Sequence, residues 1–335
     1  MPRPACPFTL RSAVLVTLLL LVAALLVIIP IGTPAAEPPP PRAVPVAAPA
    51  PDPLPPQVRP GLPEGTPTRR EVVPLRHLMK GLLLLIDEQH PLPEGYAPPD
   101  TCSIQRTSRG EVTCRDASAV LAGDALAALE ALYAAARAEE RIIQLTVFAG
   151  ARSREQQRQH LTDTLALLSR DMPVEDALAA ARSAVASPDC SEHQTGYAVD
   201  LRVCPTWNGW PDEGPLGSSA AGAWLCDNAW RFGFIRRWPD ARPDGLSCRA
   251  YHFRYVGRAH AAIIHALGCT LEDYLLLLHT HGALTLYDEN NVPAASAVCT
   301  VLQERNAVFH LPQDAAAEDT SMDNLGYAVA GCLYE

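Results

Sequence analysis

Hydrophobic and polar residues follow several distinct patterns along this chain, and each pattern predicts one kind of secondary-structure element. Alanine and leucine recur at helical spacing across residues 117–141, which predicts a long helix. The apolar run that follows, residues 142–150, is typical of a buried strand. Residues 153–170 predict a more polar helix, and Pro173 is suited to open another one over residues 173–186.

The later part of the chain continues with single strands set among helices. Residues 196–203 alternate between apolar and polar side chains as a strand does, and residues 251–256 predict a second strand. Helical spacing returns in three stretches, namely residues 219–232, 258–267 and 271–281. Because helices cluster around a few strands without regular βαβ units, the sequence predicts an α+β fold in which helices flank a small sheet.

The N-terminal segment is predicted to be a membrane anchor. Residues 12–31 are twenty uncharged, mostly apolar positions, which is long enough to span a bilayer as a helix. Arg3 and Arg11 precede this run and Glu37 follows it, so the N-terminus is expected to stay in the cytoplasm. A cleaved signal peptide, with "GTPAA" as its cleavage site, is the alternative. The first interpretation predicts a single-pass protein of the cell membrane and the second a secreted one, and both place the rest of the chain outside the cytoplasm.

Two further changes of composition predict the domain organisation. Between residues 34 and 67, fourteen of thirty-four residues are proline, which favours an extended polyproline linker. From residue 283 onwards, short apolar runs such as "ALTLY" and "AVFHL" are broken by Asn, Pro and Asp, and they predict a small β-rich appendage. The predicted parts are a cytoplasmic stub with the anchor (1–33), a linker (34–70), a main domain (71–282) and the appendage (283–335).

The charge and the cysteines narrow the class of protein. A net charge of -10 argues against a nucleic-acid surface, which needs clustered Lys and Arg. Nine of the ten cysteines follow the predicted anchor, as expected for an exported chain with disulfides. Cys102 with Cys114, and Cys299 with Cys332, are the suggested local pairs. The sequence has no CxxC motif, which argues against a zinc site built from thiolates.

The stretch "SEHQTGYAVDL", residues 191–201, places His193 and Asp200 in one short segment. A catalytic zinc site needs three protein ligands of the histidine or carboxylate type and an open fourth position. His252, in the later strand "YHFRYVG", is the natural third candidate because that strand can lie beside the first. These three residues are therefore the candidate metal ligands.

These motifs resemble the signatures of the VanY-type zinc D-alanyl-D-alanine carboxypeptidases, which are Ser-x-His-x-x-Gly-x-Ala-x-Asp and a later Glu-x-x-His. Further stretches resemble the family in the same order along the chain, namely residues 82–100, 150–157, 224–239 and 270–275. The proline-rich segment and the C-terminal region lie outside the resemblance.

The resemblance implies a domain with a small antiparallel sheet that removes the terminal D-alanine from peptidoglycan stem peptides. It implies one Zn²⁺ ion, held by the three candidate ligands, which would polarise the scissile carbonyl. Arg152 would stabilise the negative charge that develops on the carbonyl oxygen. The residues that would line the substrate cleft are Ser191, Gln157 and Tyr251.

The chain departs from the family pattern at the general base. The family carries a glutamate three residues before the second histidine, where this chain has Arg249. Arginine keeps its proton and cannot accept another, and loss of a general base typically costs about 10²–10⁴ in rate. Two interpretations stay open. The chain is an active enzyme that uses another carboxylate, for which Asp189 is the candidate, or it is an inactive homologue that binds peptidoglycan or a cell-wall partner.

Asp189 and the neighbouring Cys190 suggest a structural replacement for the missing base. If the two metal-bearing segments pair antiparallel with Cys190 opposite Cys248, then Asp189 lies opposite Arg249. The cysteines would form a disulfide on one face and the charged pair would meet on the other. The hypothesis is therefore that a structural disulfide between Cys190 and Cys248 has replaced the catalytic general base.

Overall fold

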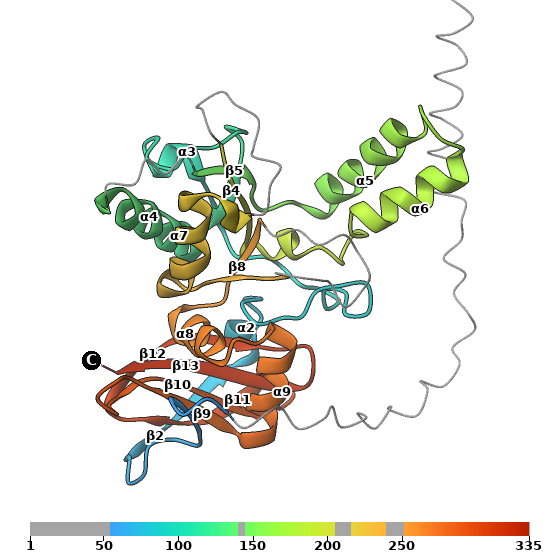
Figure 1. Ribbon diagram of the computed structural model, residues 1–335. Helices are drawn as coiled ribbons and strands as arrows, with labels where there is room; N and C mark the ends of the chain where they lie inside the picture. Colours follow the sequence, from blue (N-terminus) through green and yellow to red (C-terminus); the bar gives the residue numbers. More distant parts are fainter. Residues whose placement is uncertain (1–53, 140–144, 205–215, 239–250, 335) are drawn as a thin grey trace, which may run out of the picture. The chain divides into compact units, whose positions relative to one another are not determined.

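Antiparallel sheets organise the part of the chain that the structure describes (Figure 1). The structure is a computed structural model, and it describes residues 54–139, 145–204, 216–238 and 251–334. These residues belong to one compact unit, Leu54–Glu335. The predicted membrane anchor and most of the predicted linker lie outside the described residues.

The first sheet contains both candidate metal-binding segments. Its four strands are antiparallel and lie in the order β5 (Leu145–Ala149), β6 (Ala198–Val203), β8 (His252–Tyr255) and β7 (Phe234–Arg236). In the register of the two central strands, Asp200 lies opposite His252. The predicted α+β fold with a small antiparallel sheet is confirmed.

Helix α4 (Gly123–Ala138) covers part of this sheet, because its apolar residues recur on one face. Leu126, Leu129 and Leu132 are buried in the same core as Leu201 of β6. The shorter elements of this part are β3 (Thr101–Ser103), α3 (Ile104–Thr107), β4 (Val120–Ala122), η1 (Glu192–Thr195), η2 (Leu216–Ser218), α7 (Ala220–Asn228) and η3 (Ala229–Phe232). The short helix α2 (Leu75–Leu78) belongs with the C-terminal strands, because Leu78 is buried in the same cluster as Phe309 and Cys332.

Helices α5 (Arg154–Leu168) and α6 (Val174–Ala184) lie side by side in Figure 1, as a hairpin. A capping box starts α5: the Ser153 hydroxyl accepts from the backbone N–H of Gln156 at 3.1 Å, and the Gln156 side chain accepts from the backbone N–H of Ser153 at 2.7 Å. The cap fixes the backbone directly after Arg152, and therefore the place of that side chain.

Helices α8 (Arg258–Leu267) and α9 (Leu271–His281) follow β8 and have the predicted bounds. Among the described residues, no single helix is both long enough and apolar enough to cross a membrane. Together α8 and α9 meet the criteria of length and composition, with a bend of 98° between them.

The second sheet has five antiparallel strands, and its C-terminal strands confirm the β-rich character predicted for this region. The strand order is β1 (Val58–Pro60), β9 (Ala283–Tyr287), β10 (Pro293–Val301), β13 (Tyr327–Tyr334) and β12 (Ala315–Met322). A separate ladder pairs β2 (Thr68–Pro74) with β11 (Asn306–Pro312). Strands β1 and β2 begin within the predicted linker, where an edge strand such as β1 can accommodate proline.

Residues 82–86 form a buried segment that joins the second sheet to the rest of the unit. The backbone N–H of Leu83 donates to the Ser321 hydroxyl at 3.3 Å, and the backbone N–H of Leu85 donates to the Asn324 side chain at 3.0 Å. The Asn324 amide donates in return to the Leu85 carbonyl at 2.6 Å. The apolar core is also shared, since Leu284 of β9 and Val329 of β13 belong to the same core as Leu83.

The two predicted local disulfides are wrong, because all four cysteines are free thiols. The backbone of Cys102 pairs with that of Leu121 in β4, whereas the backbone of Cys114 forms an isolated β-bridge with Val147 in β5. On the neighbouring strands β10 and β13, Cys299 lies opposite Val329 and Cys332 lies opposite Ser296. Both pairs are thus out of register for a disulfide.

Asp319 is a buried carboxyl group where the second sheet meets the start of α8. It lies at a bulge in β12, and its Oδ2 atom is buried without a hydrogen-bond partner. Burial, assisted by the charges of Glu318 and Asp124, raises the pKa of Asp319 to about 7. A Cβ atom at Gly257, where φ is 89°, would collide with this carboxyl group.

We expect the free energy of unfolding to fall as the pH rises from about 4 to about 7, because the folded chain retains a proton on Asp319 that the unfolded chain releases. The loss has an upper bound of about 4 kcal/mol. Asp319→Asn should remove this part of the pH dependence, as measured by urea denaturation at about pH 5 and about pH 8. The same pH dependence in both proteins would contradict the assignment.

Candidate metal centre

The register of β6 and β8 brings the three predicted metal ligands together. Asp200 and His252 are neighbours across the two strands, and the Asp200 Oδ1 lies 2.8 Å from the His252 Nδ1. His193 comes from the short helix η1, which ends at Gly196 with φ at 85° and leads into β6. Its Nε2 lies 3.4 Å from the same Asp200 oxygen. The three ligand atoms are within 4.8 Å of one another, and all three residues are buried.

Hydrogen bonds orient both imidazoles so that one ring nitrogen of each faces Asp200. The Nδ1 of His193 donates to the Gly150 carbonyl at 2.7 Å, which leaves its Nε2 as a buried atom without a hydrogen-bond partner. The Nε2 of His252 lies 3.0 Å from the Glu192 carboxylate and its Nδ1 lies 2.8 Å from Asp200, so a proton on Nε2 leaves the Nδ1 lone pair for a metal. Two neutral imidazoles and one carboxylate are a donor set that suits zinc, and the outer hydrogen bonds are those that orient such ligands.

The electrostatics favour the protonation states that a metal ion requires. Burial and the nearby charge of Arg152 lower the pKa of His193 to about 4, so its imidazole is neutral. Burial opposes ionisation of Asp200, but the adjacent imidazoles of His193 and His252 outweigh it and hold the pKa of Asp200 well below its usual range. His193 and Asp200 therefore need to lose no proton at neutral pH before they bind a cation.

Glu192, next to the ligand His193, is a fully buried carboxylate with partners at both oxygens. Its Oε1 accepts from the Nε of Arg237 at 2.8 Å and lies 3.4 Å from Arg254, while its Oε2 accepts from His252. Burial alone would raise the pKa of Glu192, but Arg237, Arg254 and His252 together lower it. Glu192 is therefore a structural anion and not a general base.

Arg152 lies directly beside the ligands. Its backbone N–H donates to the His193 carbonyl at 3.0 Å, and its guanidinium donates to Gln157 at 3.0 Å. Gln157, which is only 1% exposed, donates in turn to the Ala186 carbonyl at 2.8 Å. Arg152 also lines two cavities of about 420 and about 340 Å³.

The other predicted cleft residues have different surroundings. Ser191 is buried and precedes η1, and its carbonyl accepts from the Gln194 backbone at 3.0 Å. The ring of Tyr251 lies 3.8 Å from the guanidinium of Arg202, which covers it. Neither contact joins these two residues to the ligand atoms.

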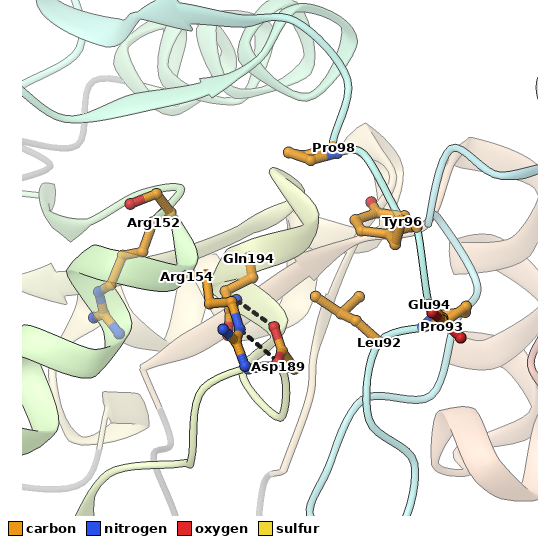
Figure 2. A pocket seen from close by; sticks show the side chains of 11 residues that line it. Leu92, Pro93, Glu94, Tyr96, Pro98, Arg152, Arg154, Asp189 and Gln194 are labelled. Atoms are coloured by element: carbon orange, nitrogen blue, oxygen red, sulfur yellow. Dashed lines mark hydrogen bonds and ion pairs between the residues drawn. The ribbon is translucent and has the colours of Figure 1, made fainter. Parts of the chain in front are cut away.

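Asp189 pairs with Arg154, whereas its predicted partner Arg249 lies outside the described residues. Figure 2 shows Arg154 and Gln194 directed at Asp189 in the larger cavity, across from Leu92 and Tyr96. The Nε of Arg154 donates to the Asp189 carboxylate at 2.7 Å, and the Asp189 backbone, with φ at 71°, donates to Gln194 at 2.7 Å. Asp189 as a substitute base stays a prediction.

Of the predicted disulfide between Cys190 and Cys248, only Cys190 lies among the described residues. Cys190 is a buried free thiol. Arg249 and Cys248 themselves lie outside the described residues.

Sequence reasoning missed the buried charges around the ligands. Arg237 and Arg254 were not assigned, although both are 2% exposed or less and both approach Glu192. The available signal was the occurrence of charged residues inside apolar stretches, "FIRRWP" and "HFRYVG". Charges in such positions are rarely buried without a partner.

Comparisons with known proteins agree with the family resemblance of the sequence. The family model VanY, D-alanyl-D-alanine carboxypeptidase, matches residues 118–258. The chain is 31% identical over 199 residues to the putative carboxypeptidase YodJ of Bacillus subtilis (strain 168), a match that covers 58% of this chain and 67% of YodJ. It is 32% identical over 196 residues to the D-alanyl-D-alanine carboxypeptidase of Enterococcus faecalis (strain ATCC 700802 / V583), covering 58% of this chain and 65% of that protein.

A solved structure supports the fold. The crystal structure of the vancomycin resistance D,D-dipeptidase VanXYg, in complex with a D-Ala-D-Ala phosphinate analog, superposes with a TM-score of 0.60 at 21% identity. The superposition covers 79% of this chain and 99% of that one. The matched part of the chain spans about two thirds of the length of the two curated relatives. By sequence and by fold, the chain belongs to the VanY family of D-alanyl-D-alanine carboxypeptidases.

Proposed function

We propose that the chain holds one zinc ion on His193, Asp200 and His252 and removes the terminal D-alanine from peptidoglycan stem peptides. The observation that carries the proposal is the convergence of two imidazole nitrogens and one carboxylate within 4.8 Å, in a family of D-alanyl-D-alanine carboxypeptidases. When bound, zinc supplies Lewis acidity for the polarisation of the scissile carbonyl.

Arg152 is proposed to stabilise the negative charge that develops on the carbonyl oxygen. Its guanidinium is held by the buried Gln157, so the positive charge is already oriented when the substrate arrives. The two cavities beside Arg152, of about 420 and about 340 Å³, have the size of small-ligand sites. Both cavities are lined by Arg152, which supports binding of a peptide end beside this side chain.

The substrate sets the compartment of the proposed reaction. Peptidoglycan lies outside the cytoplasm, and residues 12–31 have the length and hydropathy of a membrane anchor. We therefore infer a single-pass protein of the cell membrane with its peptidase domain outside, or a secreted domain if the N-terminal segment is cleaved.

A second candidate function is binding of stem peptides without hydrolysis. Arg249 occupies the position of the family's general base. The described carboxylates nearest the ligands are engaged, since Glu192 is held by Arg237 and Asp189 by Arg154. A wall-binding module would retain the cleft and the metal and would lack proton transfer.

Replacement of the residue at the base position separates the two functions. We expect the natural chain to release D-alanine slowly from a peptide that ends in D-Ala-D-Ala, and Arg249→Glu to raise kcat by about 10²–10⁴. Release is measured with a D-amino-acid assay, with and without a chelator. Arg249→Gln serves as the control for removal of the positive charge. Release by the Arg249→Glu variant alone would favour the binding module.

The three ligands should each be required for metal binding. We expect the natural chain to bind one zinc ion, whereas His193→Ala and Asp200→Asn should lower the affinity by at least about 100-fold, because a lost ligand costs more than a lost outer hydrogen bond. Asp227→Asn, at an exposed position, is the control. Metal content after dialysis measures the effect, and full zinc content in the Asp200→Asn variant would contradict the ligand set.

Gln157 should stabilise the backbone around Arg152. Gln157→Leu removes the acceptor for Arg152 and the donor for Ala186 from a buried position, so we expect a loss of about 1–3 kcal/mol in the free energy of unfolding. Gln159→Leu on the exposed side of α5 should change it by less than about 0.5 kcal/mol. Urea denaturation compares the two variants, and equal effects would argue against the role of Gln157.

A further inference from the structure

Two stretches that resemble the family lie outside the metal-binding motifs, and the structure joins them. They are residues 224–239, which contain Arg237, and residues 270–275, which contain Glu272. The guanidinium of Arg237 donates to both oxygens of Glu272, at 2.8 and 2.6 Å. This bidentate geometry fixes the plane of the guanidinium as well as its position.

The third donor of Arg237 connects this pair to the metal centre. Its Nε donates to Glu192 at 2.8 Å, and the second oxygen of Glu192 accepts from the Nε2 of His252 at 3.0 Å. The side chains of Arg237 and Glu192 are 1% and 0% exposed, whereas Glu272 at the start of α9 is 25% exposed. A continuous set of charge-assisted hydrogen bonds therefore runs from α9 to a ligand.

Trp238, the next residue along the chain, contacts the face of the same ligand. Its ring stacks on the His252 ring with centroids 5.1 Å apart and an interplanar angle of 17°. The guanidinium of Arg237 lies 4.7 Å from the Trp238 ring. One dipeptide thus restrains both the plane of the imidazole and the direction of its N–H group.

We propose that Glu272, Arg237 and Trp238 are positioning residues that set the orientation and tautomer of His252 for metal binding. The inference rests on the proposed zinc site. Without the Glu272 carboxylate, the guanidinium of Arg237 has lost the partner that holds its plane, and Glu192 has lost a fixed donor. His252 can then turn, or move its proton to Nδ1, and the lone pair no longer faces Asp200.

A variant of Glu272 tests the proposal on the full chain. Glu272→Gln should weaken zinc affinity by about 10–100-fold, in the range found for outer partners of metal ligands, and should shift the visible spectrum of the Co²⁺-loaded protein. Asp273→Asn is the matched control, because it removes the same charge from the same first turn of α9 at an exposed position. Glu272→Asp, which keeps the charge, should recover part of the affinity.

Zinc affinity is measured by competition with a chromophoric chelator, and the unfolding of the metal-free proteins is measured in parallel. Natural affinity and an unchanged Co²⁺ spectrum in Glu272→Gln would overturn the positioning role while the proposed function stands. An effect equal to that of Asp273→Asn would overturn it as well, because only the charge of the helix terminus would then matter. A natural chain that binds no zinc would overturn the proposed function itself.

Discussion

The antiparallel register between β6 and β8 is the constraint on which the site depends. It places Asp200 beside His252 although they are 52 positions apart in the chain. Val199 and Phe253, the adjacent pair, are fully buried and point to the opposite face. A slip of one residue would move the ligands and the core residues of one strand to the wrong faces, so packing of the core protects the metal centre.

Elements with strong local signals could be predicted from the sequence, whereas those that depend on distant partners could not. Helices α8 and α9 have the predicted bounds because Gly268 and Gly282 end them and Thr270 caps the second. Strand β12 lacks apolar alternation, and it exists because it pairs with β13. Strands β1 and β2 are in a proline-rich segment that acquires its pairing from β9 and β11.

The same distinction applies to the candidate site. The three candidate ligands lie in short motifs that resemble the family signatures, so they could be predicted from the sequence. The pair of Arg237 and Glu272 is separated by 35 positions and lies in two elements without a shared pattern. The two predicted local disulfides failed for a related reason, since closeness in sequence does not establish which residues face each other.

Residues 81–86 link the C-terminal strands to the candidate site, so the two parts of the chain are expected to have evolved together. Arg254, which approaches Glu192, donates to the carbonyl of Gly81, and the residues that follow are held by Ser321 and Asn324. C-terminal strands taken from a relative would support this segment only if they carried the equivalents of Ser321 and Asn324. In recombination between relatives, the terminal strands and the peptidase core should therefore be inherited together, as one block.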